Sequence, residues 1–254
     1  MMRAYELIKE TFLRRRFVWI VHLVWLATYV MFWWLFLPDP EEYGNFLFHW
    51  GGFLLPLVLS AGILGDDIAS ARICVLMTRP LYPGTLCAYR LLGLSLQGAV
   101  HFALAWGVLF AMHSVTGKGS VEGLVRWLAI TWLFFNTWAA LSTSLSVIVK
   151  RAHNALLLFV LLVTVAAVVG CLQWQAGDHW ISRVATGFAQ FACPPFKFLL
   201  EMGKGEYVDQ TLTVARHAIP KQFACVAHCL VLTGMYLLVG MRWLSRREFF
   251  SERE

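Results

Sequence analysis

Long runs of apolar residues alternate with short polar segments along the whole chain. The first run has 21 residues. As an α-helix it would be about 31 Å long, enough to cross the hydrocarbon core of a bilayer. The pattern predicts an all-α polytopic membrane protein with six transmembrane helices in a single domain, residues 1–254. The predicted spans are residues 17–37, 46–64, 91–113, 124–149, 155–174 and 223–243.

The connection between the second and third runs, residues 65–90, is too long for a tight turn and too apolar for a solvated loop. Asp66 and Asp67 can act as N-cap and first-turn acids, where they favour the positive end of a helix dipole. Arg79-Pro80 can end that helix, because the residue before a proline is disfavoured in the helical region. The pattern predicts a short amphipathic helix from Asp67 to Arg79 along the membrane surface. A loosely ordered linker is the alternative.

Two further features of this connection, Pro83-Gly84 and Arg90, lead to predictions. Pro83-Gly84 predicts a turn, because both residues favour turn conformations. Arg90 precedes the third apolar run. We expect its guanidinium to extend toward the membrane surface while its aliphatic stem lies among apolar groups.

Composition supports the membrane interpretation, and charge sets the orientation. Hydrophobic residues make up 59% of the 254 residues and charged residues 14%, against about 45–50% and about 25% in soluble domains. With six spans, fourteen of the 21 lysines and arginines fall on the side that holds both termini and residues 65–90. The positive-inside rule therefore places both termini in the cytoplasm and the long connection 175–222 outside. The net charge of +6 is explained by orientation and anionic lipid, without a nucleic-acid partner.

The sequence contains no enzyme motif that we can identify. It lacks G-x-x-x-x-G-K-[ST], H-E-x-x-H and G-x-S-x-G, so we expect a chain that is not an enzyme and has no cofactor or metal of its own. Cys225 and Cys229 are one helical turn apart and resemble half a metal site, without a second pair of ligands. One external disulfide is left open among the cysteines near the predicted outer surface. These are Cys171, Cys193 and Cys225.

Several polar residues interrupt the predicted spans. Ionisable side chains inside a membrane are candidates for function, although a single neutral histidine more often hydrogen-bonds to a neighbouring helix. The histidines concerned are His22, His101 and His228. Uncharged polar residues are expected to hold helices together at about 0.6 kcal/mol each. They are Gln97, Asn136 and Thr137.

Residues 63–93 resemble the permease subunits of type-2 ATP-binding cassette (ABC) exporters. The resemblance rests on two acids that close the second span, an Arg-x-x-x-Leu stretch, the sequence TRPL and a basic residue that opens the third span. In layout it extends over nearly the whole chain. Many members have a small polar residue and an arginine after the Arg-Pro pair, whereas this chain has Tyr82-Pro83-Gly84.

The resemblance implies a plasma-membrane subunit that pairs with a second permease copy and with a soluble ATPase, which binds ATP and Mg²⁺. The helix between the second and third spans would be the coupling helix that docks into a cleft of this ATPase. Such a chain couples ATP hydrolysis to export or to conformational signalling across the membrane, and leaves room for a periplasmic or extracellular protein partner. The expected ATPase contacts are Asp67, Arg72, Leu76, Met77, Arg79 and Pro80.

Two other regions fit this resemblance. Residues 2–16 place Tyr5, Ile8 and Phe12 on one helical face, the spacing of an interfacial helix. Family members carry an elbow helix there, and an ordinary positively charged anchor is the alternative. In residues 175–222, apolar residues recur among polar ones, which predicts short half-buried helices on the outer surface.

The alternative function is a polytopic membrane enzyme or a scaffold protein that works without an ATPase. An ion pathway is disfavoured because no predicted span carries a ladder of charges. An ATP-binding protein that purifies with this chain would distinguish a permease from these alternatives.

Overall fold

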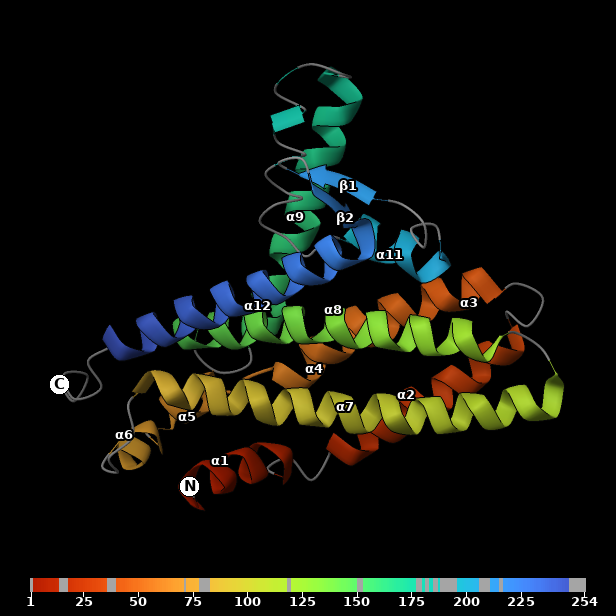
Figure 1. Ribbon diagram of the computed structural model, residues 1–254. Helices are drawn as coiled ribbons and strands as arrows, with labels where there is room; N and C mark the ends of the chain where they lie inside the picture. Colours follow the sequence, from red (N-terminus) through yellow and green to blue (C-terminus); the bar gives the residue numbers. More distant parts are fainter. Residues whose placement is uncertain are drawn as a thin grey trace.

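The computed structural model consists mainly of helices (Figure 1). Four long helices form the body of the bundle. They are α2 (Val18–Leu35), α7 (Pro83–Thr116), α8 (Val121–Ile148) and α12 (Lys221–Arg246). The structure describes residues 2–13, 18–35, 40–70, 72–77, 83–117, 120–149, 153–176, 180, 183–184, 187, 196–205, 211–214 and 217–246. Helix α8 packs against both α7 and α12, and α2 packs against α7.

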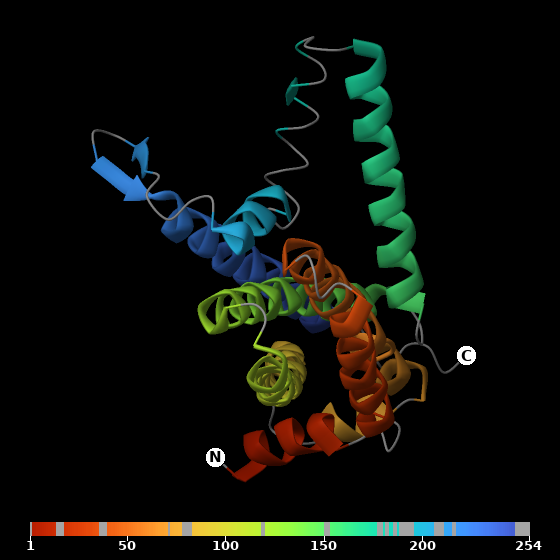
Figure 2. The same ribbon diagram turned by 90° about the vertical axis from the view of Figure 1, so that its right-hand side faces the viewer.

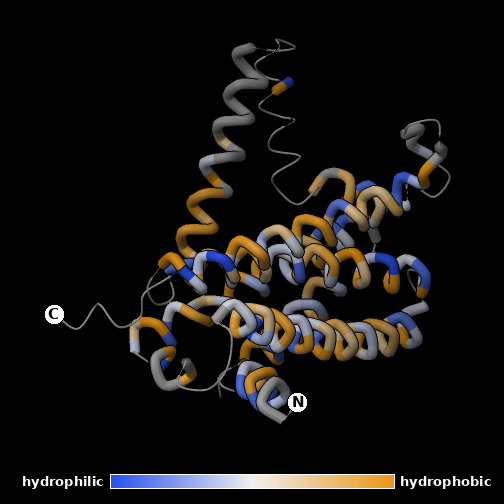
Figure 3. The backbone as a smooth tube through the Cα atoms, turned by 60° about the vertical axis from the view of Figure 1, so that its left-hand side comes forward, coloured by the Kyte–Doolittle hydropathy of each residue, from blue (hydrophilic) through white to orange (hydrophobic). Residues whose placement is uncertain are grey.

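Among the described residues, five helical segments are long and apolar enough to cross a membrane. They are Val18–Leu35, Glu42–Ala69, Gly84–Thr116, Val121–Ile148 and Lys221–Arg246. Hydrophobic positions recur along the long helices (Figure 3). The predicted class, an all-α polytopic membrane protein, is therefore confirmed, while the count of six spans stays a prediction.

The fifth predicted span forms a helix that stands apart from the bundle. Helix α9 (His153–Ala176) covers residues 155–174, and it contacts α8 and α4. Figures 1 and 2 show that it rises steeply away from the other long helices. Apolar side chains along its described part, such as Leu156, Phe159 and Val163, are consequently exposed.

The second predicted span is not one regular helix. It consists of α3 (Pro40–Leu47), the π-helix η1 (Phe48–Leu54) and α4 (Leu55–Ser60). Proline at position 56 has no N–H to donate, and the N–H of Leu55 bonds to Trp50 O, five residues back. Close packing accompanies the wider turn, because a Cβ on Gly51 would lie 2.5 Å from Tyr29 Oη.

The connection 65–90 also differs from the predicted single helix. It contains two short helices, α5 (Gly65–Ala69) and α6 (Arg72–Met77). The acids at 66 and 67 do lie in the first turn of α5, but the N-cap is Leu64 and no side chain caps the helix. Residues 78–82, which include the Arg-Pro pair, lie outside the described residues.

The predicted turn at Pro83-Gly84 is wrong, because these residues begin α7. Proline suits the first position of a helix, where its missing N–H would have no intrahelical partner. The third span therefore starts eight residues before the predicted start at 91. Arg90 is placed two turns inside the helix as a result, and the prediction that it extends toward the membrane surface is also wrong, because its side chain is fully buried.

Helix α1 (Met2–Leu13) packs along α7. Figure 2 looks nearly along α7 and shows α1 and α8 on opposite sides of it. The side of α1 that faces the protein carries the buried residues Leu7 and Thr11, while Tyr5 on the predicted interfacial face is exposed. The helix itself is as predicted, and its contact with lipid stays a prediction.

In its described part, the connection 175–222 contains a short helix, in line with the short helices predicted there, and a hairpin, which the sequence analysis did not predict. Helix α11 (Phe196–Lys204) is followed by the antiparallel strands β1 (Thr211–Val214) and β2 (His217–Pro220). A Cβ on Gly203 of α11, or on Gly44 of α3, would lie within 2.4 Å of the Trp127 ring. These two helices therefore enclose the first turns of α8.

Candidate functional site

Four charged side chains from four helices meet at the end of the bundle where α7 begins. This charged junction consists of Glu10 on α1, Asp67 on α5, Arg72 on α6 and Arg90 on α7. Arg90 Nη2 lies 2.9 Å from Asp67 Oδ2, and both side chains are fully buried. Removing one partner of a buried ion pair costs roughly 3–5 kcal/mol, so this contact fixes α5 to α7.

The N-terminal helix joins the junction through Glu10 and Thr11. Arg90 Nη1 donates a hydrogen bond to Thr11 Oγ1 at 2.9 Å, and Glu10 Oε1 lies 3.6 Å from Arg90 Nη2. Glu10 also forms an ion pair with Arg72, whose side chain is 44% exposed. One carboxylate therefore lies between a buried arginine and an accessible one, and it connects α1 to both α6 and α7.

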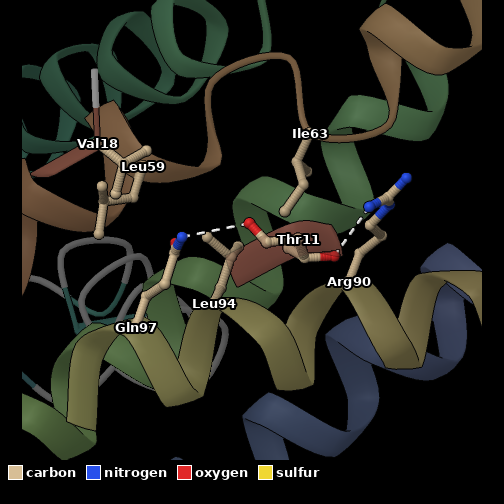
Figure 4. Close-up of a pocket in the computed structure, with 7 residues that line it drawn as sticks. All are labelled: Thr11, Val18, Leu59, Ile63, Arg90, Leu94 and Gln97. Carbon is tan, nitrogen blue, oxygen red and sulfur yellow. Dashed lines mark hydrogen bonds between the residues drawn. The ribbon is translucent and has the colours of Figure 1, made fainter. Parts of the chain in front are cut away.

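The end of α1 is seated directly on α7. A Cβ on Gly93 would lie 2.5 Å from Thr11 Cβ, so only glycine permits this approach. Gln97 Nε2 donates to the carbonyl oxygens of Thr11 at 3.2 Å and Phe12 at 2.9 Å. Carbonyls of the last helical turn have no intrahelical partner, and Gln97 supplies one. Figure 4 shows Arg90 and Gln97 reaching Thr11 from the same helix.

The predicted ATPase contacts fall into three groups. Asp67 and Leu76 are buried, and Asp67 faces Arg90 inside the protein. Arg72 is exposed and extends from α6. The side chain of Met77, and all of Arg79 and Pro80, lie outside what the structure describes.

The sequence analysis did not include Arg90 among the site residues. The sequence did contain a signal for Arg90. If the helix of the third span begins before this arginine, the arginine lies inside the span and needs a counter-ion. Two acids stand at the end of the preceding span. The sequence analysis missed the pairing of Arg90 with one of these acids because it placed the start of the third span at residue 91, after Arg90.

The junction has no reactive arrangement in its described part. The Arg90–Asp67 pair is buried and the Arg72–Glu10 pair is accessible at the surface. Neither pair places a nucleophile beside a base. The junction connects helices instead. A displacement of α6 would be passed to α7 through α5 and the buried Arg90–Asp67 pair, and to α1 through Glu10. Helices α1, α5, α6 and the end of α12 lie at the same end of the bundle (Figure 1).

The buried histidines do not stand alone. His22 Nδ1 on α2 lies 3.2 Å from His101 Nδ1 on α7, and His101 Nε2 lies 3.2 Å from Tyr29 Oη. Thr137 on α8 accepts a hydrogen bond from Thr233 on α12 at 3.2 Å, as expected of a contact between helices. Asn136 differs from its prediction, because its amide donates to a carbonyl of its own helix.

No group of three or more potential metal ligands occurs in the part of the chain that the structure describes. Cys225 and Cys229 lie buried on α12 as free thiols. The side chains of Cys171 and Cys193, the other candidates for a disulfide, lie outside the described residues.

Comparison of the chain with protein-family models finds no matching family, and comparison with curated proteins finds no match. The resemblance to type-2 ABC permeases therefore rests on the sequence motif and layout alone.

Proposed function

We propose that this chain is the transmembrane permease subunit of an ABC transporter, in which α5 and α6 form the element that docks on a separate ATPase. The observation that carries the proposal is the buried Arg90–Asp67 ion pair. A docking element can transmit movement only if it is attached rigidly to a span, and this pair attaches α5 to α7 without competition from water. The apolar helical segments described above support the membrane location.

In this proposal the side chains of the docking element have different roles. Arg72, which is exposed on α6, contacts an acid of the ATPase. Arg79, which follows α6 in the sequence, makes the same kind of contact. Met77 and Pro80 lie beside them in the sequence and complete the contact. Asp67 and Leu76 are buried, and they hold the element on the bundle.

The remaining parts of the assembly follow from the same function. The ATPase subunits bind ATP and Mg²⁺, and a second permease copy completes the transport route in the lipid bilayer. The arginine-rich end of the bundle, with both chain termini, faces the cytoplasm of a plasma membrane. The segment with α11 and the hairpin lies outside, where a periplasmic or extracellular partner can reach it.

The test is recovery of the ATPase with the tagged chain from membranes of its own host. We expect an ABC-type ATPase, identified by its Walker motifs, to purify with the wild-type chain. Arg72→Glu combined with Arg79→Glu should lower its recovery at least about tenfold, because loss of a buried arginine contact costs roughly 2–5 kcal/mol. Two variants serve as controls at equal amounts of inserted chain. Glu10→Gln breaks the internal pair of Arg72 and keeps the cation, and Arg126→Glu reverses an arginine on α8, far from α6.

Unchanged recovery with the double variant would reject the docking role. If no ABC-type ATPase purifies with the wild-type chain, the alternative function becomes the better interpretation. That alternative is a membrane enzyme or a scaffold protein that works without an ATPase.

A further inference from the structure

A line of buried polar residues follows one face of α7 from the charged junction to its contact with α2. On α7 it consists of Arg90, Gln97 and His101, each no more than 3% exposed. The spacings of seven and four residues place these side chains on one face of the helix. On α2, His22 and Tyr29 are seven residues apart and face the same seam. Ionisable residues in such a position indicate a functional site, because burial in a membrane is costly for them.

The two histidine rings face each other with their Nδ1 atoms. Only one hydrogen can lie between His22 Nδ1 and His101 Nδ1, which are 3.2 Å apart. In the neutral pair, one ring donates to the other, and His101 Nε2 either donates to Tyr29 Oη or accepts from it. The chain of three side chains is therefore complete in two orientations, which differ only in the positions of its hydrogens.

A small cavity leads from the charged junction toward this pair. It has a volume of about 20 Å³, and its lining includes Thr11, Arg90, Gln97 and Val18. Figure 4 shows the residues that line the cavity. Two of them, Val18 and Gln97, precede His22 and His101 by four residues each, which is about one helical turn. This volume suffices for one water molecule. The cavity therefore offers room for one water molecule on the side of the pair that faces the junction.

The surroundings of the pair contain few other titratable groups. Tyr29 lies on α2, and Tyr43 on α3 donates a hydrogen bond to the carbonyl of Tyr29 at 3.3 Å. Across the cavity stands the junction, where Arg90 and Arg72 are balanced by Asp67 and Glu10. The neighbourhood of the pair therefore has no excess of positive charge from the junction that would repel a proton.

We propose that His22 and His101 form a proton-binding site in the membrane interior, which takes up one proton as a unit. The added proton binds to the Nε2 atom that carries no hydrogen in the neutral pair, and one hydrogen stays between the two Nδ1 atoms. After uptake, the protonated ring donates to the neutral ring, so the contact between α2 and α7 is kept. A second proton would place two N–H groups against each other at this distance, and the pair excludes it. Tyr29 takes part by accepting from His101 Nε2, which orients the ring. This site is independent of the proposed docking on an ATPase.

The experiment follows the histidine side-chain ¹⁵N resonances of the full chain in detergent from about pH 4 to pH 8. We expect the rings of His22 and His101 to titrate together and to gain one proton between them. Glutamine keeps a polar side chain but takes up no proton, so His22→Gln or His101→Gln should move the midpoint of the remaining ring by about one pH unit or more. His113→Gln, at the far end of α7, is the matched control and should leave the pair unchanged.

Tyr29→Phe provides a second variant that keeps the aromatic ring and removes only the hydroxyl group. It should shift the common midpoint of the pair while one proton is still taken up. If a glutamine variant does not fold, the wild-type titration and Tyr29→Phe still decide the question. Separate titrations in which each ring gains its own proton would overturn the proposal. So would resonances of the pair that stay constant over this range.

Discussion

Asn154, in the first turn of α9, accepts a hydrogen bond at 2.9 Å from the backbone N–H of Gly62, 92 residues earlier in the chain. Its amide nitrogen donates to Ser60 O at 3.0 Å and to Ser142 Oγ of α8 at the same distance. The turn between α4 and α5 is thereby fastened to two other helices. This contact fixes the turn that separates α4 from α5.

Replacing Asn154 tests this fastening. Asn154→Ala leaves the buried Gly62 N–H without this partner, at a cost of about 1–3 kcal/mol, whereas the Ser60 carbonyl still accepts from the N–H of Ile63 at 3.1 Å. The free energy of unfolding in mixed micelles should fall accordingly. Asn136→Ala is the control, because Asn136 is only half-buried and its amide bonds to its own helix in the described structure. Equal losses for the two variants would contradict the role given to Asn154.

Gly62 has a conformation that a side chain would strain. Its φ is +69°, and a Cβ would lie 2.6 Å from Asp66 Oδ2. Gly62→Ala should therefore destabilise the protein by at least about 1–2 kcal/mol. Gly107→Ala in α7 should be neutral or stabilising by up to about 1 kcal/mol, since no atom lies within 4 Å of its added Cβ and alanine favours a helix. Thermal unfolding of both variants in one detergent makes the comparison.

The buried Arg90–Asp67 pair should show strong coupling in a double-mutant cycle. Arg90→Met alone leaves a buried carboxylate without its arginine and should cost about 3–5 kcal/mol. Adding Asp67→Leu should recover much of this loss, because an apolar pair of similar size can replace a buried ion pair. The surface pair Arg126–Glu122, at 2.9 Å, is the control and should couple by no more than about 0.5 kcal/mol. Additive effects at Arg90 and Asp67 would show that the pair does not hold α5 to α7.

The orientation of the chain can be tested with single cysteines on a cysteine-free background. Ser70→Cys lies at the exposed end of α5, and Lys204→Cys lies at the exposed end of α11. A membrane-impermeant thiol reagent should label the cysteine at 204 in intact cells and the cysteine at 70 only after lysis. The reverse result would invert the orientation. Position 203 is unsuitable as a probe, because a side chain there would collide with Trp127.

The sequence by itself determined the class of this protein and the approximate position of most of its helices. Apolar runs of membrane length need internal hydrogen bonds, so they form helices whatever their neighbours are. For this reason the predicted block 124–149 agrees closely with α8, and 223–243 with α12. The first-turn acids of α5 were also evident, because their effect on a helix end is local.

Contacts between distant residues decided the rest. Proline at position 83 is compatible with both a turn and a helix start, and the burial of Arg90 against Asp67 accompanies the helix. The irregular second span has close contacts of Gly51 and Gly52 with side chains of α2 and α8. The pairing of His22 with His101 joins residues 79 positions apart. A linear sequence lists these polar groups but does not show which of them share a buried seam, since that depends on how the helices pack.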